Sequence, residues 1–159
     1  MEKQAFFGLR IQILDDNPFY TTLFKTQLEH ALGINYAQHV DHFKVQAYTD
    51  PLPFLKHFPA FHSVSFLDYH LGTQQTGIDV LYKIKQKTPF AKVYMVTDEE
   101  NCYILRTCLE AGADGIIFKN QELLSLSLLV IQQTVSNPVF PYQFNGLENS
   151  LTNTYLTNF

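Results

Sequence analysis

The stretch HSVSFLDYHLG, residues 62–72, decides the fold of this chain. Its apolar residues, which include Val64, Phe66 and Leu67, form a run typical of a buried strand. The run stops abruptly at Asp68. A carboxylate at the tip of a buried strand is costly unless a partner or a function accounts for it, so this position is a candidate functional site.

Four further apolar segments of strand length occur along the chain, and helical patterns separate them. They are GLRIQILDD (8–16), FKVQAYTD (43–50), AKVYMVTD (91–98) and DGIIFKN (114–120). Strands that alternate with helices are typical of βα units, which build parallel sheets. The sequence therefore predicts an α/β fold with a doubly wound five-stranded parallel sheet. We expect the flavodoxin-like (βα)5 arrangement, with the common strand order 2-1-3-4-5.

The helix after the first strand carries the clearest local signals. Asn17 is a good N-cap, Pro18 suits the first turn and Gly33 suits the end of the helix. The apolar residues that fall near helical spacing, and so predict its buried face, are Phe19, Leu23, Leu28 and Leu32. Residues 121–136 contain LLSLSLLVI, which alternates locally like a strand, but its length and the βα rhythm favour a helix.

Length and composition limit the class of protein. A chain of 159 residues with 46% apolar and 16% charged residues predicts one globular domain, which we place at residues 1–136. The remainder, 137–159, contains no Lys or Arg, is too short for a second domain, and is expected either to pack through its aromatic residues or to stay loose. The net charge of -4 offers no general attraction for nucleic acid or an anionic membrane. No apolar run is long enough to span a bilayer, so a cytoplasmic protein is expected.

Polar residues stand where four of the five predicted strands end. Asp15 and Asp16 follow the first strand, Asp68 ends the third, Thr97 the fourth and Lys119 the fifth. Taken singly, these residues are explained as turn residues, helix caps or a solvated charge. In a parallel sheet, however, the carboxyl ends of the strands share one edge, where such folds bind ligands. Convergence on one edge favours a single site.

The carboxylates of this predicted site need a positive partner. If the first and third strands are neighbours about 4.8 Å apart, Asp16 and Asp68 face each other. Two carboxylates about 4 Å apart repel by about 4 kcal/mol at an effective dielectric of about 20. A small hard divalent ion suits an all-oxygen site, which points to Mg²⁺, with Lys119 as a second cation. Together they neutralise a transferring phosphoryl group, and Asp68 is the expected acceptor nucleophile.

These residues and their surroundings resemble the receiver domain of two-component response regulators, the CheY-like family. The motifs are ILDDNPFY, SFLDYHLG with TGIDVL, VYMVTDEE and GADGIIFKN, and the resemblance covers about residues 7–135. The separations of 29 residues from Asp68 to Thr97 and of 22 from Thr97 to Lys119 are of the kind that the family shows.

The resemblance implies a phosphoacceptor switch that catalyses only its own phosphorylation and dephosphorylation. It implies that Asp16, Asp68 and the backbone carbonyl of His70 ligate Mg²⁺, with Asp15 acting through water. Lys119 would pair with the phosphoryl oxygens. Thr97 would turn toward the phosphorylated aspartate and alter the surface formed by the fourth helix, the fifth strand and the fifth helix.

The resemblance also implies partners. The phosphoryl donor would be a sensor histidine kinase or a phosphotransfer protein. The output would be contact with a downstream protein, because residues 137–159 are expected to be too few for an effector domain. The apolar surplus of LLSLSLLVI is expected to pack on the sheet, with a partner or a second copy of the chain as the alternative.

Departures from the family pattern leave alternatives open. Ile116 stands where the family usually has Tyr or Phe, and Asp98 adds a negative charge after Thr97. Both favour a receiver-like interaction module that works without phosphorylation. A phosphohydrolase with an aspartyl intermediate is the other alternative, but His70 stands where a second acid would be needed.

Overall fold

The computed structural model describes residues 8–72 and 74–136 as alternating strands and helices, and the predicted extension at 137–159 lies outside them. The strands are β1 (Leu9–Leu14), β2 (Phe43–Tyr48), β3 (Ser63–Asp68), β4 (Lys92–Thr97) and β5 (Gly115–Phe118). The helices are α1 (Pro18–Asn35), the short 3-10 helix η1 (Val40–His42), α2 (Pro51–Lys56), α3 (Gly77–Lys87), α4 (Cys102–Glu110) and α5 (Leu123–Val135).

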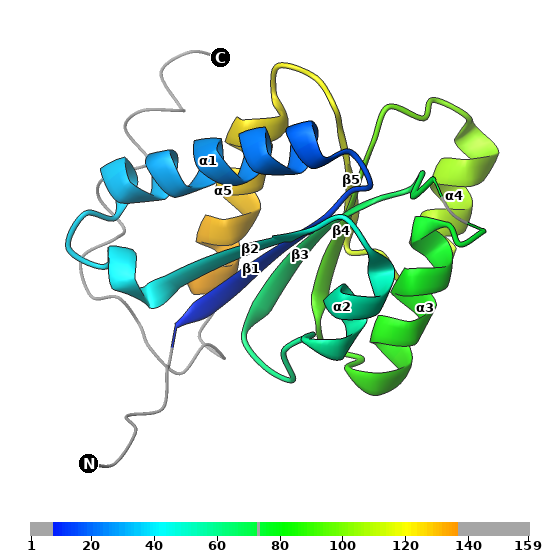
Figure 1. Cartoon of the computed structure of the whole chain (residues 1–159), viewed down its shortest axis with the longest axis horizontal. Coiled ribbons are helices and arrows are strands. Elements are labelled where there is room, and N and C mark those ends of the chain that lie inside the picture. Colours follow the sequence, from blue (N-terminus) through cyan, green and yellow to red (C-terminus); the bar gives the residue numbers. More distant parts are fainter. Residues whose placement is uncertain (1–7, 73, 137–159) are drawn as a thin grey trace.

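The five strands form one parallel sheet in the order β2-β1-β3-β4-β5. Helices α1 and α5 cover one face, and α2, α3 and α4 cover the other (Figure 1). The predicted doubly wound, flavodoxin-like arrangement is therefore confirmed, including the strand order. The segment at 121–136 is a helix, as its length predicts.

Strand β3 lies at the centre of the sheet, and all six of its residues are buried. Its side chains alternate between the two apolar cores, with Phe66 on the α1/α5 side and Leu67 on the opposite side. The Phe66 ring meets Phe24 of α1 edge to face, with 5.6 Å between centroids. Because the whole strand is buried, Asp68 at its end has a fixed position at the carboxyl edge of the sheet.

Helix α1 differs from its predicted boundaries and buried face. Asn17 caps it as expected, accepting hydrogen bonds from two backbone N–H groups. The helix continues past Gly33 to Asn35, however, because Gly33 does not adopt the positive φ with which a capping glycine ends a helix. The predicted contacts of Phe19 and Leu23 are wrong, since these side chains are 76% and 44% exposed. The buried residues of the helix are Thr21, Phe24, Leu28 and Leu32.

Helix α4 begins later than a cap at Thr97 would place it. Asn101 is the N-cap, and its side chain accepts a hydrogen bond from the backbone N–H of Tyr103 at 2.9 Å. Thr97 therefore belongs to the strand end and the following turn rather than to the helix. Cys102 and Cys108 of this helix are both free. Among the described residues, none of the helices has the length and hydropathy needed to cross a bilayer.

Candidate functional site

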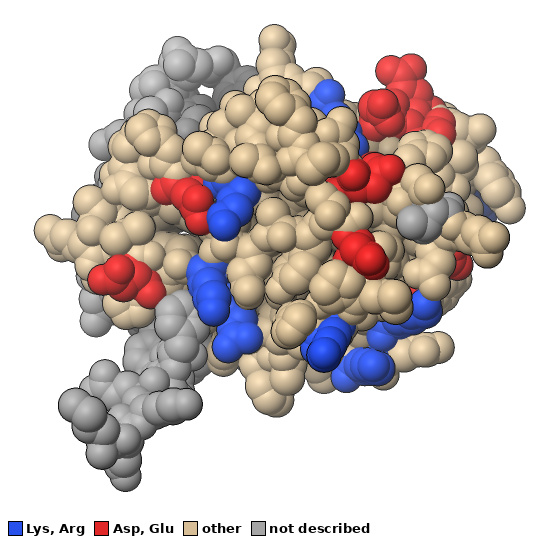
Figure 2. All heavy atoms as spheres, viewed as in Figure 1, with Lys and Arg blue, Asp and Glu red and all other residues tan. Residues whose placement is uncertain are grey.

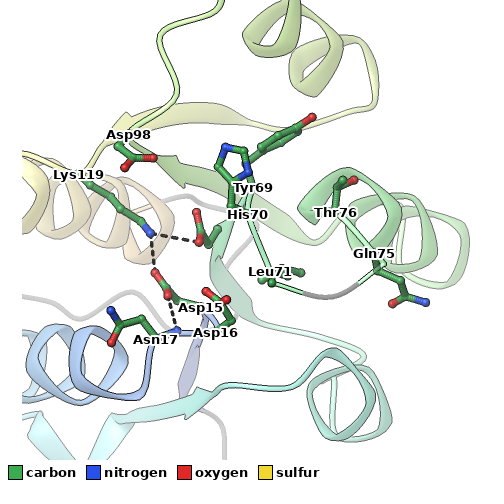
Figure 3. Close-up of a pocket in the computed structure, with 12 residues that line it drawn as sticks. Asp15, Asp16, Asn17, Tyr69, His70, Leu71, Gln75, Thr76, Asp98 and Lys119 are labelled. Atoms are coloured by element: carbon green, nitrogen blue, oxygen red, sulfur yellow. Dashed lines mark hydrogen bonds and ion pairs between the residues drawn. The ribbon is translucent and has the colours of Figure 1, made fainter.

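The carboxyl edge of the sheet is hollowed by a cavity of about 570 Å³ (Figure 3). The parallel register pairs Leu14 of β1 with Leu67 of β3, so the residues that follow them, Asp15 and Asp68, leave the sheet side by side. Lys119 enters the cavity from the residue after β5. The strand order therefore brings together groups separated by about a hundred residues in the chain.

Three carboxylates form the floor of the cavity. Within the described part of the chain, Asp15, Asp16 and Asp68 are the group of acids that is close enough to hold a metal ion, with one oxygen of each within 4.8 Å of the others. Asp15 is 2% exposed and Asp68 is 4% exposed, whereas Asp16 faces solvent. The backbone N–H of Asn17 donates to Asp15 Oδ1 at 2.8 Å, which fixes the orientation of that carboxylate.

Lys119 supplies the positive charge that such a cluster requires. Its Nζ lies 2.6 Å from Asp15 Oδ2 and 3.1 Å from Asp68 Oδ2. The backbone N–H of Lys119 donates to the carbonyl of Thr97 at 2.9 Å, which ties the start of the loop after β5 to β4. Burial alone would lower the pKa of Lys119, but the two carboxylates raise it, so the ammonium stays charged.

The ring of Tyr20 lies beside this ammonium, with Nζ 4.7 Å from its centroid. Burial raises the pKa of Tyr20 to about 12, so the side chain is a neutral phenol. Sequence reasoning gave this residue no role, although Tyr20 ends the quoted motif ILDDNPFY in the first turn of α1. Its contact with Lys119 depends on the packing of α1 beside α5, which a local sequence pattern does not specify.

The charge of Asp68 is poorly stabilised by the protein alone. Burial raises its pKa from 3.8 to about 6 and Asp15 adds to the increase, although Lys119 opposes it. Asp68 Oδ1 is buried and has no hydrogen-bond partner among the described residues. A buried carboxylate oxygen without a partner is rare unless a ligand or ion completes it.

The donor set fits Mg²⁺. All three side chains offer carboxylate oxygens, which hard divalent cations prefer, and the open side of the cavity leaves room for water ligands. The unpartnered Asp68 Oδ1 is the atom that most needs a cation. His70 also lines the cavity, but the use of its backbone carbonyl as a ligand remains a prediction.

Two glycines allow the loop after β3 to approach the acids. Gly72 has φ +58, and a Cβ at this position would collide with the carboxylate of Asp16. Gly77 lies at the start of α3, where a Cβ would collide with the backbone carbonyl of Asp68. The sequence pattern gave no sign that Gly72 lies against Asp16, because this contact depends on the path of the loop.

Thr97 does not point into the cavity as the acids and Lys119 do. It is 1% exposed, and its hydroxyl accepts a hydrogen bond from the backbone N–H of Glu99 at 3.0 Å. It is not among the described residues that line the cavity. The structure thus gathers four of the five predicted side chains around one cavity. The fifth, Thr97, lies at the adjacent strand end and is turned toward its own loop.

The mouth of the cavity is acidic on the side of β4. Asp98 lines it, and the Glu99 carboxylate lies 3.4 Å from Nε2 of His70. Figure 2 shows acidic side chains gathered at the upper right of this face, where the chain passes from β4 to α4. An anion that approaches Lys119 from this side therefore meets negative charge at the rim first.

Comparison with known protein families gives one consistent match. A family model for the response regulator receiver domain matches residues 11–130. A cyclic di-GMP phosphodiesterase of Thermotoga maritima is 41% identical over 78 residues, which are 48% of this chain and 20% of that protein. The chain therefore spans about a fifth of the length of this curated relative.

Solved structures show the same fold. The BeF3-activated DrrB receiver domain, from a Thermotoga maritima protein, has a TM-score of 0.65 at 22% identity, with 82% of this chain and 99% of that chain covered. A CheY-like receiver domain protein from Methanospirillum hungatei has a TM-score of 0.64 at 22% identity, with 80% and 94% covered. The NtrX receiver domain from Brucella abortus has a TM-score of 0.62 at 20% identity, with 80% and 98% covered.

Proposed function

Because this chain belongs to the response regulator receiver domain family, we propose that it is a phosphoacceptor switch and that Asp68 receives the phosphoryl group. The observation that carries the proposal is the position of Lys119, whose ammonium touches both Asp15 and Asp68 while Asp68 Oδ1 stays unpartnered. Such an arrangement offers a nucleophilic oxygen and a fixed positive charge at the same point.

In the transfer step, an oxygen of Asp68 attacks the phosphorus of a phosphohistidine. The new O–P bond forms as the N–P bond of the donor breaks, and the donor imidazole leaves with the bonding electron pair. Asp68 must be ionised to attack, and with a pKa of about 6 it is ionised at neutral pH. Lys119 then pairs with the phosphoryl oxygens, exchanging its contact with Asp68 for one with the group that Asp68 carries.

Asp15, Asp16 and Asp68 would hold Mg²⁺, together with the carbonyl of His70. The ion would supply positive charge to offset that of the phosphoryl oxygens and the three carboxylates. Tyr20 packs under Lys119 and limits the positions of the ammonium to those over the acids. Among the described residues, Lys119 is the cationic side chain that forms an ion pair with Asp68.

The output proposed for the switch is a change of shape around α4, β5 and α5. The hydroxyl of Thr97 now accepts a hydrogen bond from Glu99 N–H. Turning toward a phosphorylated Asp68 would break that bond and release the loop before α4. The partners proposed are a sensor histidine kinase or a phosphotransfer protein as donor, and a protein target for the output, all in the cytoplasm. A second copy of the chain stays an alternative partner.

A receiver-like module that works without phosphorylation is the second candidate function. It is favoured by Asp98, which adds a carboxylate to the lining of the cavity, and by Ile116, which stands in place of the family's aromatic residue. In either case we propose that residues 1–136 form the receiver domain and that 137–159 are an extension. We further propose that the domain turns over only its own phosphoryl group.

Incubation with Mg²⁺ and acetyl phosphate, followed by intact mass measurement, tests the proposal. We expect the mass to rise by one phosphoryl group in the wild type, and the increase to be absent in Asp68→Asn. Asp41→Asn, in the 3-10 helix remote from the cavity, is the matched control and should be labelled normally. Circular dichroism of each variant checks that it is folded, and borohydride trapping locates the acyl phosphate.

Absence of any adduct, with acetyl phosphate and with phosphoramidate as donors, would support the phosphorylation-independent module instead. An adduct that persists in the folded Asp68→Asn variant would assign the acceptor to another residue.

A further inference from the structure

A second hollow lies at the amino edge of the sheet, the edge opposite the acidic cavity. It has a volume of about 470 Å³ and is lined by residues 60–63 before β3, residues 87–92 between α3 and β4, and Thr134 of α5. These connections lie in the lower part of Figure 1. We call this hollow the amino-edge groove. None of the residues assigned to the phosphoacceptor site lines it.

The groove is flanked by two of the most exposed phenylalanines of the described chain. Phe61 is 79% exposed and Phe90 is 95% exposed. Both stand in short connections, where polar residues are the rule, and Pro89 precedes Phe90. Two aromatic side chains left in water beside a preformed hollow mark a surface that something covers.

The chain itself supplies a candidate at the rim of the groove. Helix α5 runs antiparallel to the strands, so it returns the chain to the amino edge of the sheet. Val135 is buried in the core, and Thr134 lines the groove. The described chain therefore leaves the domain at Ser136, beside the hollow.

The sequence that follows is suited to an apolar groove. It reads NPVFPYQF over residues 137–144, and its two prolines disfavour a helix. In an extended chain alternate side chains point the same way, which places Phe140, Tyr142 and Phe144 on one side. Residues 137–159 contain no Lys or Arg that the rim residue Lys87 would repel.

We propose that residues 138–144 bind in the amino-edge groove, with their aromatic side chains against Phe61 and Phe90. A short tether gives the attached segment an effective concentration in the millimolar range, so even weak contacts keep it bound. A second copy of the chain has no such advantage at low concentration. The amino-edge groove is thus an internal binding site for the extension, independent of the phosphoacceptor site.

Disulfide trapping in the full chain tests this inference. A Lys87→Cys, Gln143→Cys pair is made in a Cys102→Ser background, in which the remaining native Cys108 is buried. The control pair is Glu100→Cys with Gln143→Cys, because Glu100 is exposed and lies at the other end of the domain, before α4. We expect the intramolecular disulfide to form at least about tenfold faster in the first pair.

Adding Phe90→Ser to the first pair should remove most of this advantage. The substitution does not endanger the fold, because the side chain is 95% exposed. The proposal would be overturned if the intramolecular disulfide formed equally fast in the two pairs. It would also be overturned if Phe90→Ser did not change the rate in the first pair. Intermolecular disulfides that dominate and increase with protein concentration would also overturn it, because a second copy would then fill the groove.

Discussion

Replacing Asp68 with asparagine is expected to stabilise the metal-free protein at neutral pH. Burial raises the pKa of Asp68 from 3.8 to about 6, although Lys119 opposes the increase. One pKa unit corresponds to about 1.36 kcal/mol, so ionised Asp68 lowers the free energy of unfolding by about 3 kcal/mol. Because the asparagine amide is itself buried and polar, we expect a net gain of about 1–3 kcal/mol.

The gain in stability from Asp68→Asn should disappear at acid pH. A carboxyl group whose pKa is higher in the folded state binds its proton more tightly there than in the unfolded chain. The wild type therefore becomes more stable as the pH falls from about 6 to 3.8, where the protonated Asp68 no longer opposes folding. The free-energy difference between D68N and the wild type should be large at about pH 7.5 and small at about pH 4.

Asp114 provides a control, because its pKa is shifted in the opposite direction to that of Asp68. Burial alone would raise its pKa, but hydrogen bonds from Val93 N–H, Lys92 and Lys85 lower it overall. Its stabilising contribution is present above pH 3.8 and is lost as the pH falls through the lower folded pKa, so D114N should lose stability at neutral pH. Urea unfolding followed by circular dichroism, with EDTA present, measures all three proteins. The reasoning on Asp68 is wrong if D68N is no more stable than the wild type at about pH 7.5. It is also wrong if the stability advantage of D68N is as large at about pH 4 as at about pH 7.5.

Three further substitutions test other parts of the site and its frame. Lys119→Met should slow labelling by acetyl phosphate about 100-fold, since the cation that touches Asp68 is lost; mass-resolved time courses measure this. Gly72→Ala should weaken Mg²⁺ binding about tenfold in calorimetric titrations, because the added Cβ collides with the carboxylate of Asp16, and unchanged affinity would contradict that role. Asn101→Ala should cost about 1 kcal/mol in thermal unfolding through loss of the α4 cap, and an unaltered melting temperature would argue against the cap.

The strands and the acidic edge were predictable because they depend on short, local patterns. Apolar runs of strand length ended in Asp15, Asp68 and Lys119, and the parallel topology brings such ends together. The strand order was expected only because it is common among doubly wound folds, since an apolar run does not specify which strands lie beside it.

Side-chain faces and rotamers were less predictable, because tertiary packing selects them. In α1, both Phe19 with Leu23 and Phe24 with Leu28 satisfy helical spacing, and only the second pair packs on the sheet. The orientation of Thr97 toward Glu99 is likewise set by a turn that no residue pattern specifies.

The path of the described chain has a consequence for its attachment to other proteins. It enters at the start of β1 and leaves at the end of α5, and both points lie on the amino edge of the sheet. A domain joined at either point would therefore be attached at the edge of the sheet opposite the acidic cavity. This geometry suits a unit that is joined to other domains, and the 78 matched residues make up 20% of a longer relative.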